Sequence, residues 1–510
     1  MTGDSTRTLI RGARVFDGER LRPASNVLLA GRTIAGIGAG LSVPAGAEVI
    51  EGRGQTLLPG LIDCHVHASN VRALGQALAF GVTTELDMFS GPDLAAERRS
   101  LAARRDDVAD IRTSVQGATP AGGTLARFTP GLPTVTGPQD AAAFVSDQAA
   151  HGADYLKIYL EDSAWYGSPA LSAATVRALV TAAHHHGMLA IAHADSAAMA
   201  RMFIQAGGDA LAHVLSDLDL TPAFLADLRH RPAFVIATLR ATAVLSAAHA
   251  RQIEADQREL ARHPRLGPFL DQPTRAAFTR PGLLADARAR GAVAACAGGR
   301  LDFDGALRSV AALHQAGIQV LAGTDTNYPG PPDQGNAILN AYAGHGIAMH
   351  HELELLVRAG LSPATALAAA TSIPARLFGL TDRGRIAPGM RADLLLVDGD
   401  PCAVITATRN IAAIWRSGAR LHREPQLAPH AAITTTPAAH TPASPAASQR
   451  LCALCPCAAC PGAEPEASGP GDGHPSHDAR GTGSQIECLL DIEAVLDGLP
   501  TRSPARPSGS

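Results

Sequence analysis

The spacing of hydrophobic positions changes near residue 59 and again near residue 381. Residues 7–58 contain short apolar or alternating runs such as TLIRGARVF, NVLLA and TIAGIG, separated by turn residues, and these runs predict β-strands. Between residues 59 and 380, short apolar runs alternate with Ala-rich stretches of helical character; the runs are LIDCHVHA, VTTELDM, YLKIYL, LAIAHA, ALAHVL, AFVIATL and VLAGTD. Such alternation is typical of parallel strands joined by crossover helices. Seven or eight such units predict an α/β fold, a (β/α)8 TIM-type barrel.

The segments on either side of this predicted barrel differ from it in pattern. Residues 381–422 return to β character, with RADLLLVDGD and IAAIWRSGARL. We expect residues 1–58 and 381–422 to form one small β-sandwich domain beside a barrel of residues 59–380. Residues 423–510 are rich in Pro, Ser, Thr, Ala and Gly and poor in large apolar residues, which predicts a disordered tail. Within it, IECLLDIEAVLDGL at residues 486–499 is a short amphipathic exception.

Composition narrows the class of partner. The 510 residues carry a net charge of −4 without a basic block, which argues against nucleic acid or an anionic membrane as the main partner. The chain begins without the apolar core of a signal peptide, and no run of about 18 apolar residues occurs in it. Three of the eight cysteines are scattered through residues 1–422, as a reducing compartment permits. We therefore expect a cytoplasmic protein.

Metal-ligand side chains stand near the ends of the predicted barrel strands. His65 and His67 lie two positions apart in LIDCHVH, so they project to the same side of their strand and can share one metal ion. His193, His213 and Asp325 lie at the ends of three later strands. Because barrel active sites are built at the carboxyl ends of the strands, these side chains predict a common site.

Lys157 is the only lysine in the chain, so every other basic residue of the Lys and Arg class is arginine. The composition is thus strongly biased towards arginine over lysine. A position that nevertheless retains lysine is explained by a need for an amine that can lose its proton, which arginine cannot supply. Chance survival of one lysine is the alternative explanation. Lys157 lies in YLKIYL, another of the predicted barrel strands.

These strings together resemble the amidohydrolase superfamily, and in particular its imidazolonepropionase-like and Xaa-Pro or Xaa-Arg dipeptidase-like branch. The resemblance covers most of residues 7–422 and rests on LLPGLIDCHVH, GVTTELDM, GADYLKIYLED, AIAHA, DALAHV, GTDTNYPG and GRIAPGMRADLLLVDGDP. It implies a distorted (β/α)8 barrel with a β-sandwich built from both ends. It also implies a metal-dependent enzyme, usually with zinc, and homo-oligomers are frequent in the family.

Carried over to this chain, the resemblance assigns His65, His67 and Asp325 to the more buried metal ion and His193 and His213 to the second. Lys157 would bridge both ions as a carbamate formed with carbon dioxide. Two Zn2+ ions bridged by water would generate hydroxide near neutral pH. Asp325 would take the proton of that water and pass it to the leaving nitrogen. The predicted reaction is hydrolysis of a C–N bond in a small amide, dipeptide-like or cyclic amide substrate.

Other functions remain open at this stage. A mononuclear deaminase of the same superfamily is the nearest alternative, but the glutamate that such enzymes place beyond the third histidine is not found after His193 or His213. An imidazolone-type ring hydrolase is a second alternative, and a catalytically inactive scaffold protein is a third, although all six ligand candidates are present. The tail string CALCPCAAC has thiolate spacings that metal sites use, but only one residue separates its two cysteine pairs, so a cysteine-rich low-complexity segment is the favoured interpretation.

Overall fold

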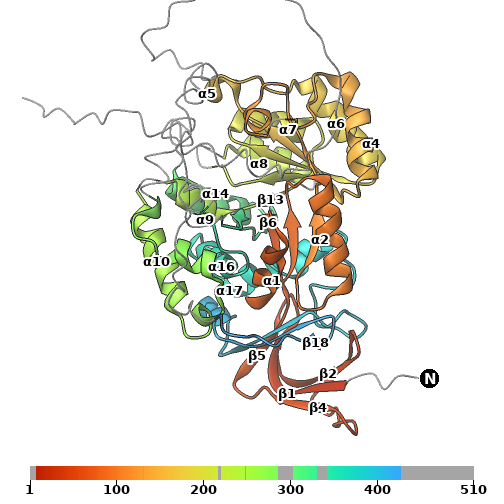
Figure 1. Ribbon diagram of the computed structural model, residues 1–510, viewed down its shortest axis with the longest axis vertical. Coiled ribbons are helices and arrows are strands. Elements are labelled where there is room, and N and C mark those ends of the chain that lie inside the picture. The colour runs from red at the N-terminus through yellow and green to blue at the C-terminus, as the bar shows by residue number, and fades with distance from the viewer. Residues whose placement is uncertain are drawn as a thin grey trace, which may run out of the picture.

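The computed structural model describes residues 7–129, 131–215, 220–231, 233–246, 248–284, 302–329, 340 and 342–426. The cysteine-rich string and the amphipathic segment 486–499 lie outside these described residues, so the predictions for them stay predictions. The described chain forms a barrel-like body above a smaller β-sheet, which lies at the lower end of the molecule in Figure 1.

Parallel strands form the wall of the barrel. In chain order they are β6 (Leu61–His67), β7 (Val82–Asp87), β8 (Asp110–Thr113), β9 (Gly117–Ala118), β10 (Tyr155–Leu160), β11 (Leu189–Ala194), β12 (Ala210–Ala212), β13 (Phe234–Ile236), β14 (Val320–Leu321) and β15 (Thr326–Asn327). They pair as two sheets, in the orders β15-β6-β7-β8 and β14-β13-β12-β11-β10-β9. The predicted α/β barrel of TIM type is therefore confirmed.

The two sheets meet at two seams, where the chain passes from one sheet to the other. At the first seam, β8 continues into β9 through Val115, whose φ is 60°. At the second, β14 continues into β15 through Asp325, whose φ is 55°, and the amide of Cys64 donates to the Ala322 carbonyl at 3.0 Å. Left-handed backbone is costly for both residue types, most of all for the β-branched valine. These breaks account for the distortion of the barrel.

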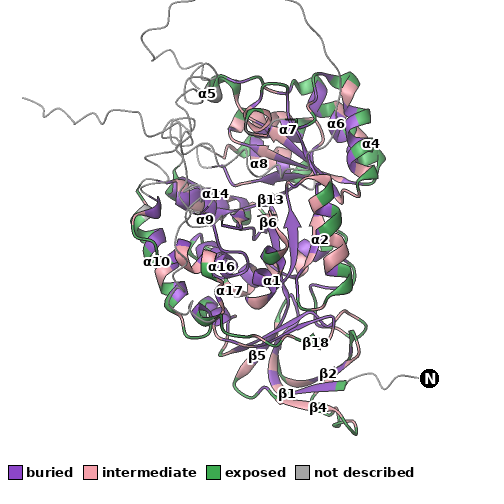
Figure 2. Cartoon of the chain, viewed as in Figure 1, coloured by how far each residue is buried: buried purple, intermediate pink, exposed green. Residues whose placement is uncertain are grey.

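Helices cover the outside of the strands. They are α1 (Val71–Ala79), α2 (Pro92–Arg104), α3 (Thr124–Phe128), α4 (Ala141–Ala150), α5 (Ser163–Tyr166), α6 (Ala173–His185), α7 (Ala197–Gln205), α8 (Pro222–His230), α9 (Leu239–Leu245), α10 (Ala250–Arg262), α11 (Gln272–Thr279), α14 (Phe303–Gln315), α16 (Ile347–Arg358), α17 (Pro363–Ala369) and α18 (Ser372–Leu377). Figure 2 shows the strands at the centre buried, while exposed positions gather on the outer faces of the helices. This is the pattern expected where amphipathic helices bury one stripe against a sheet.

Both flanking β segments enter a single sheet below the barrel. Its order is β18-β17-β16-β5-β1-β2-β3, with β4 paired to β1. The strands are β1 (Arg7–Phe16), β2 (Leu21–Ala30), β3 (Thr33–Gly38), β4 (Glu48–Glu51), β5 (Gln55–Pro59), β16 (Leu394–Asp398), β17 (Ile411–Arg416) and β18 (Ala419–Arg420). Because β5 pairs with β16, chain segments more than 330 residues apart lie side by side. The division into a composite sandwich and a barrel at residue 58/59 stays a prediction.

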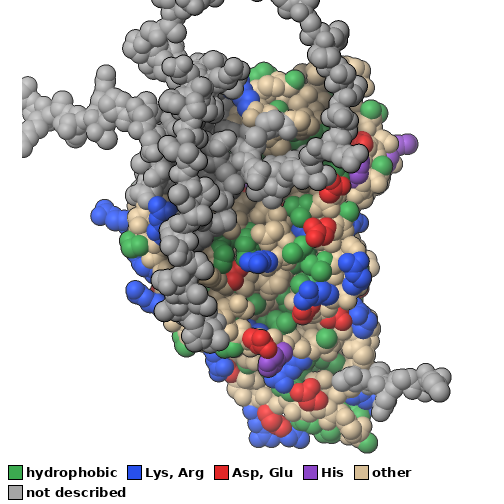
Figure 3. Space-filling model, viewed as in Figure 1, with side chains coloured by type: hydrophobic (Ala, Val, Ile, Leu, Met, Phe, Trp, Pro, Cys, Tyr) green, Lys and Arg blue, Asp and Glu red, His purple; other side chains and the backbone are tan. Residues whose placement is uncertain are grey.

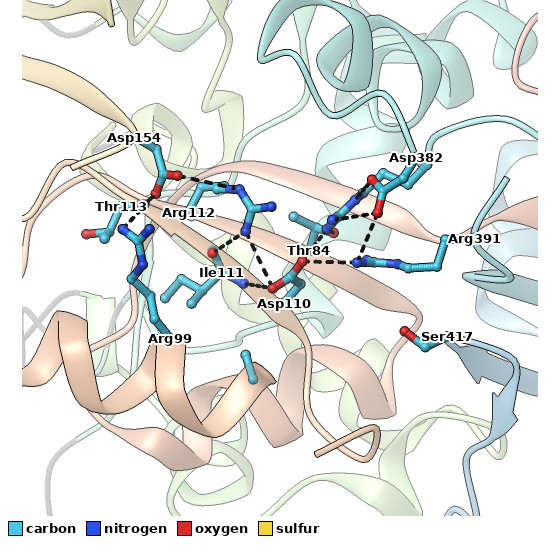
Figure 4. Close-up of polar contacts among 12 residues, drawn as sticks. Thr84, Arg99, Asp110, Ile111, Arg112, Thr113, Asp154, Asp382, Arg391 and Ser417 are labelled. Carbon is cyan, nitrogen blue, oxygen red and sulfur yellow. Dashed lines mark hydrogen bonds and ion pairs between the residues drawn. The ribbon is translucent and has the colours of Figure 1, made fainter. Parts of the chain in front are cut away.

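An arginine and aspartate network joins this region to the base of the barrel (Figure 4). Asp110 on β8 accepts hydrogen bonds from Arg383 and from Arg391, the latter at 3.2 Å. Burial alone would raise the pKa of Asp110, but Arg383, Arg112 and Arg391 outweigh that effect and hold the pKa well below its usual range. The network therefore fixes the segment before β16 against the barrel with an ionised carboxylate at its centre.

The described part of one face of the molecule carries charges of both signs. Figure 3 shows acidic and basic side chains interspersed on the described part of the face in view, without a basic field there. Among the described residues, none of the helices combines the length and apolar character that a membrane crossing needs. At the end of the described chain, Arg423 stacks on the Phe269 ring and the Gln426 amide donates to the Pro268 carbonyl. The first residues after 422 therefore pack on the barrel.

Candidate metal centre

The His-x-His pair lies at the end of β6 and meets Asp325 there. His65 is 1% exposed and His67 is partly exposed. The Nε2 atoms of His65 and His67 lie 3.2 and 3.1 Å from Oδ1 of Asp325. The Asp325 amide donates to the His65 carbonyl at 2.7 Å, which holds the second seam of the barrel against β6. The two histidines and the aspartate therefore converge on one point, as the sequence predicts.

His213 and His193 extend this group around the barrel mouth. The His213 ring lies 4.7 Å from that of His65 and 4.8 Å from that of His193, measured between centroids. His193 stands on β11, and His213 follows β12 directly with a φ of 73°. A left-handed histidine at a strand end stores strain of about 1–3 kcal/mol, which is characteristic of functional sites.

Lys157 approaches the same group from β10. Its Cα lies opposite Gly117 and Ile191 in the sheet, and Tyr159 lies opposite His193. The Lys157 side chain is 1% exposed, and its Nζ has no hydrogen-bond partner among the described residues. Nζ lies 5.6 Å from the Tyr159 ring centroid, and that ring stacks on His193 at 5.7 Å. All six residues predicted to form the site thus surround one region of the barrel mouth.

Burial sets the protonation states of these groups. It lowers the pKa of Lys157 to about 7, although the nearby Asp325 carboxylate opposes the shift. Burial and the charge of Lys157 lower the pKa of His65 to about 3 and that of His193 to about 4. Burial would raise the pKa of Asp325, but the histidines around it, with His65 first, keep it well below its usual value. The site therefore presents neutral imidazoles at His65 and His193, the Asp325 carboxylate, and a Lys157 amine that loses its proton near neutral pH.

Two supporting residues escaped the sequence analysis. The Thr238 hydroxyl lies 2.8 Å from Nδ1 of His213 and so leaves Nε2 as the free ring nitrogen. The Asp63 carboxylate accepts hydrogen bonds from the His65 amide at 3.2 Å, the Thr324 amide at 3.0 Å and the Thr324 hydroxyl at 2.6 Å. Asp63 thereby ties β6 to the segment that carries Asp325. For Asp63, the sequence signals were an aspartate inside an apolar strand and Thr324 next to the predicted ligand Asp325, whereas Thr238 had no comparable signal.

The residues present fit a divalent metal ion. One ligand atom each of His65, His213 and Asp325 lies within 4.8 Å of the others. Neither ring nitrogen of His65 makes a hydrogen bond of normal geometry, although Nε2 lies close to Asp325. Buried polar atoms without partners are costly, so His65 and Lys157 require an interaction that the described side chains do not give them. Imidazole nitrogens with carboxylate oxygens are a donor set that suits Zn2+.

Comparison with known proteins identifies the family of the chain. The Amidohydrolase family model matches residues 56–422. The chain is 47% identical over 62 residues to the dihydroorotase of Streptomyces coelicolor, which is 12% of this chain and 13% of that protein. It is 38% identical over 118 residues to the imidazolonepropionase of Cereibacter sphaeroides, which is 22% of this chain and 25% of that protein. These matches thus span a quarter or less of each relative.

Solved structures share the fold over a longer stretch. A Xaa-Pro dipeptidase with methionine bound in the active site covers 81% of this chain and 99% of its own, with a TM-score of 0.63 and 20% identity. The match to molinate hydrolase covers 85% of this chain and 100% of that protein, with a TM-score of 0.64 and 17% identity. Structural similarity at this level of sequence identity establishes the fold alone. The family model matches most of the sequence and therefore establishes the family. The chain therefore belongs to the amidohydrolase family.

Proposed function

We propose that this protein is a metal-dependent amidohydrolase that hydrolyses a C–N bond of a small amide, dipeptide-like or cyclic amide substrate. The observation that carries the proposal is the convergence of four histidines, Asp325 and the only lysine of the chain at the carboxyl ends of the barrel strands. The names of the relatives, which include dihydroorotase, imidazolonepropionase and Xaa-Pro dipeptidase, support a substrate of this kind.

The ligand set favours two metal ions, most simply Zn2+. His65, His67 and Asp325 would hold one ion, because Asp325 lies within 3.2 Å of both imidazoles. His193 and His213 would hold the other, with the Thr238 hydroxyl fixing the orientation of the His213 ring. Lys157 would bridge the two. Its amine nitrogen adds to the carbon of carbon dioxide and releases one proton, which leaves a carbamate with two oxygens that can serve as ligands.

When bound, the metal pair supplies Lewis acidity and lowers the pKa of water towards neutrality. The protein residues then move the proton. The Asp325 carboxylate is ionised and faces the same point as His65 and His67, so it accepts the proton of the attacking water. The same carboxyl group delivers that proton to the leaving nitrogen as the C–N bond breaks. The products are a carboxylic acid and an amine.

The alternatives make different demands on the site. An enzyme with a single metal ion, whether a deaminase or an imidazolone-type ring hydrolase, needs neither a bridging carbamate nor a buried, unpartnered lysine amine. A scaffold protein has no need for neutral imidazoles arranged with strained backbone at a strand end. The arrangement of Lys157, His193 and His213 therefore favours the hydrolase with two ions.

A substrate screen tests the proposal. The full-length protein is loaded with Zn2+ and assayed against panels of dipeptides, N-acyl amino acids, lactams and cyclic ureides, with detection of released carboxylic acid and amine. We expect turnover in one panel, loss of turnover after chelation and recovery on restoring Zn2+. Release of ammonia from an aminated ring would instead support the deaminase, and no turnover of any panel with full metal loading would support the scaffold.

A further inference from the structure

Arg240 is buried two residues after Thr238, which contacts the candidate ligand His213, and two of its three guanidinium nitrogens have no hydrogen-bond partner among the described residues. It lies on α9, and its side chain is 0% exposed. Its Nη2 donates to the Ala343 carbonyl at 2.9 Å. Its Nε and Nη1 are both buried and have no partner among the described residues. No other arginine in the described part of the chain leaves two buried guanidinium nitrogens unpartnered.

The nearby glutamate does not neutralise this guanidinium by direct contact. Glu352 accepts hydrogen bonds from the backbone amides of Leu239 and Arg240, at 2.9 and 2.8 Å, so both its oxygens serve the start of α9. On another side the Phe278 ring lies 5.8 Å from the guanidinium carbon. Burial of a cation without a paired anion costs several kcal/mol, and arginine stays protonated in proteins. Like His65 and Lys157, Arg240 therefore has buried nitrogens for which the described residues supply no hydrogen-bond partner.

The sheet register places Ala343, whose carbonyl accepts the hydrogen bond from Arg240, two strands away from the candidate ligand His67. Asn327 on β15 pairs with His67 on β6, and on its other side Asn327 forms a bridge with Ala343. Neighbouring strands lie about 4.8 Å apart, so the backbones of His67 and Ala343 are roughly 10 Å apart. Arg240, which donates to the Ala343 carbonyl, therefore lies at one end of this interval, and the candidate ligand His67 lies at the other. Asp325 is also among the carboxylates whose charge acts on Arg240.

We propose that Arg240 is the specificity-determining residue of the site and binds a carboxylate carried by the leaving group of the substrate. Nε or Nη1 can donate one hydrogen bond, and the second hydrogen of Nη2 can donate another. The guanidinium thus offers two neighbouring N–H donors, which match the two oxygens of a carboxylate. The inference rests on the proposed function and narrows it. The substrate is an anionic amide, such as a dipeptide or an N-acyl amino acid with a free carboxyl group next to the scissile nitrogen.

Binding and turnover are measured separately, so that a failure of the Arg240 proposal can be told apart from a failure of the hydrolase proposal. The probes are N-acetyl-L-amino acids and the matching N-acetyl-L-amino acid amides, which differ only in the carboxyl group. Isothermal titration calorimetry on the Zn2+-loaded full chain measures their affinity, and an amine-release assay on the same compounds measures hydrolysis. The variants are Arg240→Gln and Arg240→Lys. The control is Arg201→Gln, since Arg201 on α7 also makes one hydrogen bond, to Thr221, and lies 5.8 Å from a phenylalanine ring.

The wild-type protein and Arg201→Gln should bind at least one acid on the order of 100-fold more tightly than its amide. Arg240→Gln should lose this preference. Arg240→Lys keeps the positive charge but lacks the paired N–H donors of a guanidinium, so it should keep part of the preference. Equal binding of acid and amide by the wild type, no binding of either, or an unchanged preference in both Arg240 variants would overturn the inference. Acid-selective binding without turnover would leave the inference standing and refute the hydrolase proposal for these amides.

Discussion

The ring of Tyr159 occupies the space that a side chain at residue 117 would need. A Cβ placed on Gly117 would lie 2.5 Å from Cε2 of Tyr159 and 3.4 Å from Cγ of Lys157. Tyr159 in turn stacks on His193 and lies beside the Lys157 amine. The absent side chain of Gly117 therefore helps to set where Lys157 and His193 lie at the barrel mouth.

Gly117→Ala should disturb the site through this contact. We expect a loss of stability of about 1–3 kcal/mol from overpacking, with a loss of metal affinity as Tyr159 and its neighbours shift. Thermal unfolding and metal content measure the two effects. Gly75→Ala is the matched control, because a Cβ there meets nothing within 4 Å and alanine stabilises a helix interior by about 0.5–1 kcal/mol. Equal behaviour of the two variants would argue against this role of Gly117.

Asp325→Asn should separate proton transfer from folding. Asparagine keeps the size of the side chain but cannot accept and return a proton, so kcat should fall by about 10²–10⁴. The melting temperature should stay near that of the wild type when metal is supplied in excess. Steady-state kinetics on a substrate from the screen, at saturating Zn2+, measure the change. A kcat within tenfold of the wild type would assign proton transfer to another group.

Truncation after Gln426 should leave a folded and active protein. The Gln426 amide is the last described group that packs on the barrel, and the family model ends at residue 422. A shortened chain of residues 1–426 should match the full chain in melting temperature, metal content and kcat/KM. A cut after Arg420 is the comparison, since it removes Arg423 from Phe269 and should lower stability. Lost activity in the longer fragment would indicate that residues 427–510 take part in the site.

Substitutions of Lys157 test the carbamate. Lys157→Ala should lose activity and metal while staying folded. Lys157→Arg should be equally inactive, because a guanidinium stays protonated and does not react with carbon dioxide. Small carboxylic acids such as acetate or propionate should restore part of the activity of Lys157→Ala by supplying two oxygens. An active Lys157→Arg protein, without rescue of the alanine variant, would mean that the lysine serves only the packing of β10.

The sequence was most informative where ligand-type residues lie at the ends of segments with the hydrophobic pattern of a strand. Alternating apolar runs predicted the barrel strands, and ligand-type residues at their ends predicted the group around His65, Lys157 and Asp325. The third strand region was missed, because β8 and β9 are short and are interrupted at Val115. The hydrophobic pattern of a sequence does not predict a left-handed backbone at a valine. Val115 has this conformation where the chain passes from one sheet to the other.

Other features depended on contacts between distant segments. Asp63 meets Thr324 across 261 residues, and Arg240 meets Ala343 across 103. In the sequence, Asp63 reads as a polar interruption of a strand and Arg240 as one arginine among many. The role of Asp63 follows from the hydrogen bonds that its buried carboxylate accepts, and that of Arg240 follows from its burial and from the nitrogens that lack a partner among the described residues. These properties exist only in the folded chain.

The number of metal ions in the active protein tests the central proposal most directly. The protein is stripped with a chelator and titrated with Zn2+, while bound metal per chain and amide hydrolysis are measured on the same samples. We predict that activity rises to its maximum only as the content approaches two ions per chain, and that Lys157→Ala does not reach this content. Full activity at one ion per chain, unchanged by a second, would contradict the two-metal site and favour the mononuclear alternative.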